Sequence, residues 1–407
     1  MIRIREGSKA DIPAAIDFLS RMHNPAKKNW YELLAGGRHP GTDISNFIIA
    51  KDAGKIVALA IYQPWNYSYC GHILKGARIE EAFCEHKYKK QGVVHDMISQ
   101  IADLAVREGC LFELAYGQDA LYGLHSLLGY TYGVPDEEDG CVYMLQDENT
   151  NGAFRIEEAS DDDIPFMAKL YQKNYTRNLL AQAIGCKEMD YVKNAYAGTG
   201  VYHCKFFVII KTSKGEPCGF FLSQTSGRRI YMMELDDTCS YFQIRPYLSA
   251  FYRQHGLDRI PLKLGATHPI YTVFQGCFHQ RESSELGYVK AYNVPKFLMS
   301  IAVILNKRLA SSPYAFFTST FTMAMHDAGE VLRFVFEDGK LTDVSPVSQH
   351  TGEVNIERDR FIRLLFGRVS PQEMEAEKWM YWFENDDYRN IFAILFPKIQ
   401  SHVVALN

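Results

Sequence analysis

The chain has 407 residues, which is too many for one hydrophobic core of ordinary size, so two or three domains are expected. Apolar residues make up 47% and charged residues 23%, as is usual in water-soluble globular proteins. The net charge of -4 argues against a large nucleic-acid or membrane-surface partner, although a local basic cluster could still bind a phosphate.

The nine cysteines are spread along the chain, and no two of them are closer than fourteen positions. This spacing contains no Cys-x-x-Cys or Cys/His metal-binding pattern, and an odd number argues against a complete set of disulfides. The first residues are charged, and no run approaches the roughly 20 apolar residues of a membrane span. We therefore expect a cytoplasmic protein with reduced thiols and no metal site.

The chain begins with a predicted strand, a helix cap and an amphipathic helix, and the same pattern returns 152 positions later. Residues 2–13 and 154–165 are identical at seven of twelve positions. Ser8 and Ser160 are placed to cap the two helices, with acidic residues in the first turn. Pro13 and Pro165 stand early in the helices, where a missing N–H costs little. The pattern indicates an internal repeat.

Each copy of the repeat continues into a predicted β-hairpin. Its two strands span 46–50 and 56–62 in the first copy, and 205–210 and 219–222 in the second. The polar segment 146–152 predicts a linker. We therefore expect a first domain at residues 1–150 and a second at 153–293.

The segment most informative about chemistry follows the first hairpin. Residues 76–84 predict a strand that leads through a basic loop into a helix closed by Gly109. The loop and first helical residues are Lys89, Lys90, Gln91, Gly92, Val93, Val94 and His95. Free backbone N–H groups at a helix N-terminus, with a glycine and two lysines beside them, form a pyrophosphate cradle. An ordinary strand-to-helix turn with solvated lysines is the alternative.

Residues 294–407 have a different pattern and predict a separate α+β domain. The expected elements are a helix at 295–309, strands at 316–325, 331–336 and 340–344, and helices at 359–366 and 388–396. Asp338-Gly339 is placed to form a hairpin turn, Gly367 to end a helix, and Pro397 to stop the last one.

The order of elements in the first domain resembles the GNAT acetyltransferase superfamily. The phosphate motif of that family is Arg/Gln-x-x-Gly-x-Gly/Ala, and Lys89-x-x-Gly92-x-Val94 stands in its place, with departures at Lys89 and Val94. Tyr88 and the pair Gly129-Tyr130 also look like family features. The resemblance extends over the whole chain. Its architecture, a GNAT domain followed by a second GNAT-like domain and a sterol-carrier-protein-like domain, resembles that of the mycobacterial enhanced-intracellular-survival aminoglycoside acetyltransferases and uncharacterised bacterial relatives.

This resemblance implies an α+β fold with mixed sheets: two tandem GNAT-like acyl-CoA N-acyltransferase domains plus a sterol-carrier-like domain. It implies acetyl-CoA as cosubstrate, a primary amine of a small molecule or peptide as acceptor, and a possible homo-oligomer. The second domain has acids and no glycine at residues 234–242, so it is expected to be a scaffold that lost cofactor binding. A CoA-binding sensor, or a carrier of an apolar ligand in the last domain, remains an alternative.

The resemblance also implies roles for individual residues. The backbone around Ala82, Phe83 and Cys84 would face the thioester, and Cys84 itself is expected to be a buried thiol. The leaving-group acid of the family is a tyrosine at the position of His125, and Tyr122, one helical turn earlier, is the substitute candidate.

The general base stays open between two possibilities. In the enhanced-intracellular-survival enzymes the C-terminal carboxylate reaches the active site, which would make the carboxylate of Asn407 the base here. Glu80, Glu81 and Glu85 are the alternatives, acting directly or through water.

Overall fold

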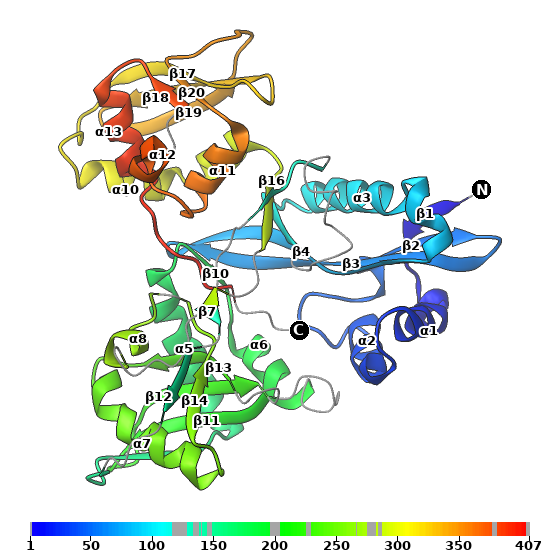
Figure 1. The fold of residues 1–407 in the computed structure, drawn as a ribbon, viewed down its shortest axis with the longest axis vertical. Coiled ribbons are helices and arrows are strands. Elements are labelled where there is room, and N and C mark those ends of the chain that lie inside the picture. The colour runs from blue at the N-terminus through cyan, green and yellow to red at the C-terminus, as the bar shows by residue number, and fades with distance from the viewer. Residues whose placement is uncertain are drawn as a thin grey trace.

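The computed structural model consists of three lobes that meet near the middle of the molecule (Figure 1). They follow one another along the chain, from the N-terminal to the C-terminal residues. The structure describes residues 2–115, 128–132, 138–139, 141–144, 149–195, 204–224, 229–265, 267–274, 282–283, 287–376 and 381–403. Within these ranges, no helix is both long and apolar enough to cross a membrane.

The first lobe is an antiparallel meander with helices on both of its faces. Helix α3 covers one face, and helices α1 and α2 lie on the other (Figure 1). The predicted hairpin is confirmed, and its second strand is longer than expected. The elements are β1 (Arg3–Glu6), η1 (Lys9–Asp11), α1 (Ile12–Met22), η2 (Pro25–Lys27), α2 (Lys28–Ala35), η3 (Ile44–Asn46), β2 (Phe47–Asp52), β3 (Lys55–Tyr69), β4 (His72–Cys84), η4 (His86–Gln91), α3 (Val93–Arg107) and β5 (Phe112–Ala115).

The second lobe repeats this arrangement. Its elements are β9 (Phe154–Glu158), η5 (Asp161–Asp163), α5 (Ile164–Asn174), η6 (Tyr175–Arg177), β10 (Leu180–Gln182), α6 (Cys186–Asp190), η7 (Tyr191–Ala195), β11 (Cys204–Thr212), β12 (Pro217–Gln224), β13 (Ile230–Leu235), α7 (Tyr241–Gln254), β14 (Arg259–Leu262) and α8 (Ile270–Val273). The β11–β12 hairpin is the second predicted hairpin, and both of its strands extend beyond the expected residues.

The helix starts of the two copies are built alike. The backbone N–H and hydroxyl of Ser8 both donate to Asp11, at 2.9 and 2.6 Å. Those of Ser160 donate to Asp163, at 2.8 and 2.8 Å. The predicted caps are therefore present, and each opens a short 3-10 turn before the α-helix begins. Reciprocal bonds of this kind satisfy the free groups of the first turn.

Strands β4 and β13, each the fourth of its meander, also share a bulge. The pairing of β4 with β3 skips Glu80, and the pairing of β13 with β12 skips Tyr231. An extra residue in one strand bends it and redirects the side chains that follow. The repeat seen over twelve residues of sequence thus extends at least to strands β4 and β13, which precede helices α3 and α7.

The two sheets exchange strands across the expected domain boundary. β8 (Cys141–Met144) pairs with β14 in the sheet of the second lobe, and β16 (Tyr288–Ala291) lies between β5 and β6 (Thr131–Tyr132) in the sheet of the first. Among the described residues the sheet orders are β1-β2-β3-β4-β5-β16-β6, with β10 paired to β3, and β8-β14-β13-β12-β11-β9. β7 (Glu138–Asp139) and β15 (Glu282–Ser283) form a separate pair. The two sheets therefore do not correspond to the sequence ranges 1–150 and 153–293, because each sheet includes a strand from the other range.

The third lobe is a sheet of order β19-β18-β17-β20-β21 with helices packed against it. Its elements are α9 (Val294–Ser300), α10 (Ala302–Ala310), β17 (Ser319–Met325), β18 (Glu330–Glu337), β19 (Lys340–Pro346), β20 (Val354–Ile356), α11 (Arg358–Leu365), α12 (Pro371–Ala376), β21 (Tyr381–Phe383) and α13 (Asp386–Leu395). The single helix predicted at 295–309 is wrong, because the chain leaves helical geometry at Ile301, where φ is -98° and ψ is 6°. Ile301 is buried, so the apolar pattern continues through the break.

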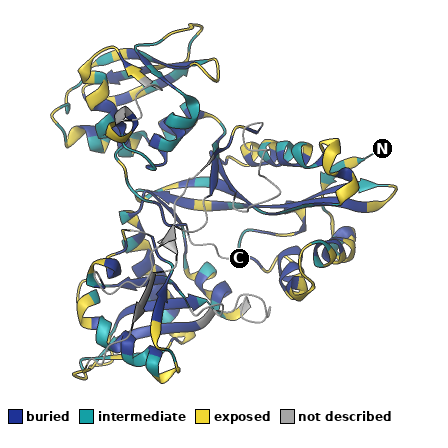
Figure 2. Ribbon diagram, in the orientation of Figure 1, coloured by how far each residue is buried: buried dark blue, intermediate teal, exposed yellow. Residues whose placement is uncertain are grey.

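An aromatic cluster joins the first and third lobes. The ring centroids of Phe112, Phe297 and Phe366 lie 5.3 to 6.0 Å apart. A side chain at Gly76 would place its Cβ 2.6 Å from the Phe112 ring, so only glycine permits this approach. The Tyr69 hydroxyl donates to the carbonyl of Leu365 at 2.6 Å. Figure 2 shows that the strands and inward helix faces at this junction are buried.

Candidate active site

Strands β4 and β5 pair in parallel over a short stretch. The pairing runs from Ala77–Glu113 to Ile79–Ala115, and β4 continues to Cys84. Within the described residues, the stretch from the Glu80 bulge to Cys84 has no strand partner on the β5 side. The backbone groups of this stretch that do not pair with β3 are candidates to bind a ligand.

The chain turns from β4 into α3 through the basic loop. Gly92 ends the 3-10 helix η4 with φ of +74° and begins α3 directly. The amides of Val93, Val94 and His95 lie in the first turn, where an α-helix offers them no acceptor. A Cβ at Gly92 would have no described atom within 4 Å, so a side chain at this position would meet no described neighbour.

One side-chain contact anchors this loop. The Tyr88 hydroxyl donates to Asp52 at 2.8 Å, which ties the loop to the β2–β3 turn. Lys89 and Lys90 are exposed and are free to turn toward a phosphate. Burial raises the pKa of the Cys84 thiol, although the charge of Lys89 opposes this. A thiol that stays protonated is a poor nucleophile, which argues against an acetyl-cysteine at this position.

The structure brings ten of the predicted residues to one end of the first sheet. Ala82, Phe83 and Cys84 end β4, and residues 89–95 follow them directly. Glu81 lies on the same strand, and with Phe83 it faces α1 and α2 rather than α3. Tyr122, His125 and Asn407 lie outside the described residues, so their predicted roles stay predictions.

Each of the candidate glutamates is paired with a cation rather than solvated. Arg78 lies 3.0 Å from Glu80, and Arg21 lies 3.1 Å from Glu85. The Glu81 carboxylate lies 3.4 Å from the ammonium of Lys27 and 3.1 Å from Nδ1 of His23. The contacts of Glu81 with Lys27 and His23 were not expected from the sequence.

The residues around Glu81 come from the connection between α1 and α2. α1 ends at His23 because Pro25 has no N–H with which to continue a helix. The side chain of Asn24 then accepts from the amide of Ala26 at 2.9 Å and starts η2, which carries Lys27. Tyr31 follows in α2, and its hydroxyl lies 2.8 Å from Nδ1 of His23. The spacing of four residues between His23, Lys27 and Tyr31 is the only signal of this group in the sequence.

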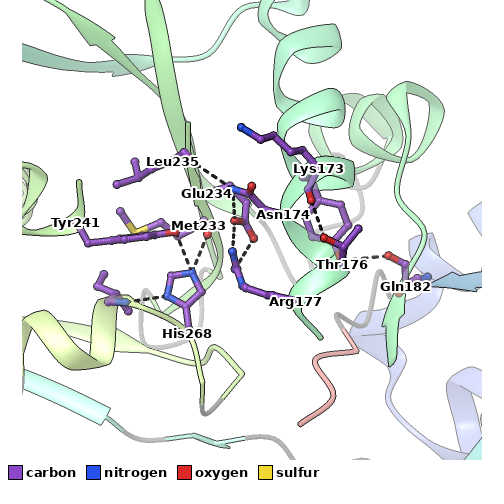
Figure 3. Close-up of polar contacts among 12 residues, drawn as sticks. Lys173, Asn174, Thr176, Arg177, Gln182, Met233, Glu234, Leu235, Tyr241 and His268 are labelled. Carbon is purple, nitrogen blue, oxygen red and sulfur yellow. Dashed lines mark hydrogen bonds and ion pairs between the residues drawn. The ribbon is translucent and has the colours of Figure 1, made fainter. Parts of the chain in front are cut away.

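The corresponding opening in the second lobe is filled. β13 and β14 pair in parallel at Ile230–Leu262 and then part. The ring of His268 lies in the gap, with Nε2 2.9 Å from the carbonyl of Met233 (Figure 3). Met233 occupies the place that Ala82 has in β4, as the two registers show.

The helix start of the second lobe is also occupied. Ser240 caps α7. Its hydroxyl oxygen accepts from the backbone N–H of Gln243 at 3.3 Å, and the side-chain oxygen of Gln243 accepts from the backbone N–H of Ser240 at 3.0 Å. Asp236 and Asp237 precede this cap, so their negative charge would repel a phosphate. Both findings support the expectation that the second lobe is a scaffold.

The C-terminal segment docks between the lobes. The amide of His402 donates to Leu180 in β10 at 2.8 Å, and the amide of Leu179 donates to Gln400 at 2.9 Å. The His402 ring is buried against Gly265, where a side chain would place its Cβ 2.9 Å from the Cβ of His402. The tail thus contacts β10, which pairs with β3 of the first sheet.

This docking is expected to weaken in acid. Burial lowers the pKa of His402 to about 4, and the charges of Arg177 and Lys263 act in the same direction. A histidine in the unfolded chain has a pKa near ~6.5. The contribution of the buried, neutral His402 ring to the stability of the docked tail is therefore complete above that pH, and it falls by about 3 kcal/mol as the pH approaches 4. Proteolysis of the tail should accelerate over this range. In His402→Phe this acceleration should be much smaller, and an unchanged pH dependence would contradict the assignment.

Among the described residues, no group of three or more His, Cys, Asp or Glu side chains could hold a metal ion. The reactive features of this site are backbone amides, two lysines and the group around Glu81.

Solved structures resemble this chain over its whole length at low sequence identity. A conserved protein of unknown function and probable N-acyltransferase from Enterococcus faecalis V583 gives a TM-score of 0.75 at 9% identity, covering 100% of this chain and 99% of that one. A GCN5-related N-acetyltransferase from Anabaena variabilis ATCC 29413 gives 0.73 at 12% identity, covering 99% of each chain. Eis1 from Mycobacterium abscessus gives 0.61 at 13% identity, covering 100% of each chain.

No protein-family profile and no curated protein matches the sequence. The structural likeness therefore concerns the fold: the chain has the fold of the GCN5-related N-acetyltransferases, with mixed α+β sheets. The predicted fold class and the GNAT resemblance are confirmed at this level. The sterol-carrier-like character of the third lobe stays a prediction.

Proposed function

We propose that the protein is an acetyl-CoA-dependent N-acetyltransferase with its active site in the first lobe. It transfers the acetyl group directly from the thioester to a primary amine of a small molecule or peptide, in the cytoplasm. The second lobe serves as a scaffold.

One observation carries the proposal. In the first lobe the strand segment 80–84, which has no described strand partner on the β5 side, leads directly into a helix N-terminus with two exposed lysines, whereas His268 and Ser240 occupy the corresponding places in the second lobe. A helix N-terminus binds phosphate through its free amides and its partial positive charge. The proposed cofactor would lie along residues 80–84 and present its thioester to their backbone.

The geometry also explains how residues of this chain would act. Amides of the β4 edge can stabilise the oxyanion that forms as the amine attacks the thioester carbonyl. Binding both substrates at one end of the sheet would hold the amine near the carbonyl carbon. The amine must lose a proton, which requires a base on the acceptor side.

Thiol release from acetyl-CoA tests the proposal. The purified protein is incubated with acetyl-CoA and a polyamine, an aminoglycoside, a peptide with a free N-terminus or a lysine-containing peptide, and the acetylated product is identified by mass spectrometry. We expect amine-dependent thiol release with at least one acceptor. Tight acetyl-CoA binding in calorimetry without turnover would instead support a CoA sensor, and no binding would remove the proposal.

A further inference from the structure

His23 lies between a carboxylate and a phenol on the face of the first sheet that α1 and α2 cover. Its Nδ1 is 3.1 Å from Oε1 of Glu81 and 2.8 Å from the hydroxyl of Tyr31. Both contacts use the same ring nitrogen. Within the described part of the chain, no hydrogen bond to Nε2 is found.

These contacts select one tautomer of the neutral ring. A carboxylate can only accept a hydrogen bond, so the contact with Glu81 is attractive only if Nδ1 carries the proton. The tyrosine hydroxyl can accept from the same N–H, because it is both donor and acceptor. The opposite tautomer would place the lone pair of Nδ1 against a negative oxygen at 3.1 Å. The unprotonated nitrogen is therefore Nε2.

The position of the ring relates it to the proposed thioester site. The His23 ring packs against Phe83, with centroids 4.9 Å apart, and Phe83 lies within the β4 segment 82–84. The His23 side chain is 29% exposed, whereas that of Glu81 is 10% exposed and Tyr31 is buried. Of these three polar groups, His23 is the one that an acceptor can reach.

We propose that His23 Nε2 is the general base of the transfer and that Glu81 and Tyr31 are positioning residues. This inference rests on the proposed function and gives His23 the role of base, which the sequence left open between the Asn407 carboxylate and the glutamates. The amine nitrogen forms a bond to the acetyl carbon while its proton passes to Nε2. The C–S bond breaks, its electron pair stays on the CoA sulfur, and the thiolate then takes up a proton, so that CoA leaves as the free thiol.

The charges around the ring bear on its protonation. Glu81 on β4 favours the protonated form that follows proton transfer, and Lys27 on η2, 3.4 Å from the same carboxylate oxygen, opposes it. Tyr31 on α2 contributes a neutral hydroxyl. Arg21 on α1 and Glu85 form a nearby ion pair, and their opposite charges largely cancel at the ring. A general base must be unprotonated to act, so the pH–rate profile tests the role of this ring.

The first test compares His23→Asn with His72→Asn. Asparagine can still donate to Glu81 but cannot accept a proton, and His72 lies at the far end of β4. With the acceptor found in the amine panel, we expect kcat of the His23 variant to fall about a hundredfold or more, as is usual for loss of a general base. Its affinity for acetyl-CoA should change less than twofold, and the acidic limb of the pH–rate profile should disappear. His72→Asn should behave as the wild type.

Glu81→Gln tests the positioning role. Glutamine keeps an acceptor for Nδ1 but removes the charge, so kcat should fall about tenfold and the acidic limb should move, which loss of packing alone would not cause. Long-range 15N NMR of histidine-labelled protein gives an independent check, with His23 assigned by its absence in the asparagine variant. We expect the Nδ1–H tautomer at pH above 7.

Each result decides one question. If the wild type acetylates no amine, the proposed function fails. If the wild type is active and His23→Asn retains its kcat, the base assignment fails while the function stands. A truncation before residue 404 that abolishes kcat while His23→Asn does not would return the role to the C-terminal carboxylate. An Nε2–H tautomer would also overturn the inference.

Discussion

Gly92→Asp is expected to weaken acetyl-CoA binding about a hundredfold. A carboxylate at this position would stand at the N-cap of α3, beside the proposed pyrophosphate site, and its Cβ would meet no described atom within 4 Å. Two like charges about 4 Å apart near a protein surface repel by up to about 4 kcal/mol, and about 2.7 kcal/mol already corresponds to a hundredfold change in affinity. Isothermal titration calorimetry with acetyl-CoA measures the effect.

Gly92→Asn is the matched control for this prediction. Asparagine has nearly the same shape as aspartate and, like it, tolerates a positive φ such as the +74° of Gly92. The asparagine variant should therefore report any backbone strain or steric loss without the charge. Equal affinities for the Asp and Asn variants would show that no phosphate lies in front of α3, and the proposed cofactor site would then be wrong.

Arg177→Ala should destabilise the second lobe by about 3 to 5 kcal/mol, the usual cost of leaving a buried charge without its partner. Two nitrogens of Arg177 donate to the two carboxylate oxygens of Glu234, each at 2.8 Å (Figure 3). Glu234 is buried, and Asn174 donates to it at 2.9 Å. Burial raises the pKa of Glu234 even with Arg177 present, so loss of the arginine should lead it to bind a proton.

Urea unfolding at pH 7 followed by circular dichroism measures this loss. Lys173→Ala provides the control, because Lys173 pairs with Asp237 at the surface, where ion pairs contribute about 0 to 1 kcal/mol. Because Glu234 would remain buried without its cation, the arginine variant should lose less stability at pH 5 than at pH 7. A loss below about 1 kcal/mol at pH 7 would mean that the lobe relaxes to let water reach Glu234.

Local chemistry made much of the first lobe predictable. The serine caps, the hairpins and the amphipathic helix after Gly92 depend on neighbouring residues, and all are present in the structure. The residues that form the loop at the start of α3 were likewise consecutive in sequence. Their arrangement follows from one strand, one turn and one helix.

Contacts between distant segments were not predictable in this way. The backbone hydrogen bonds of a strand are the same for every residue type, so nothing in residues 141–144 or 288–291 identifies the sheet that each joins. The break at Ile301 was hidden because a buried residue there continues the apolar pattern. The group around Glu81 joins residues 54 and 58 positions apart, and only packing of α1 and α2 on β4 brings them together.

The sequence by itself determined the repeat and the position of the basic loop, because each depends on residue pattern over a short range, and the fold class followed from the resemblance to the GNAT superfamily. The tertiary structure alone decided the strand exchange, the closure of the second opening by His268 and the placement of His23 beside Glu81. These features depend on which surfaces meet when the helices and sheets pack, and a single sequence does not record that choice.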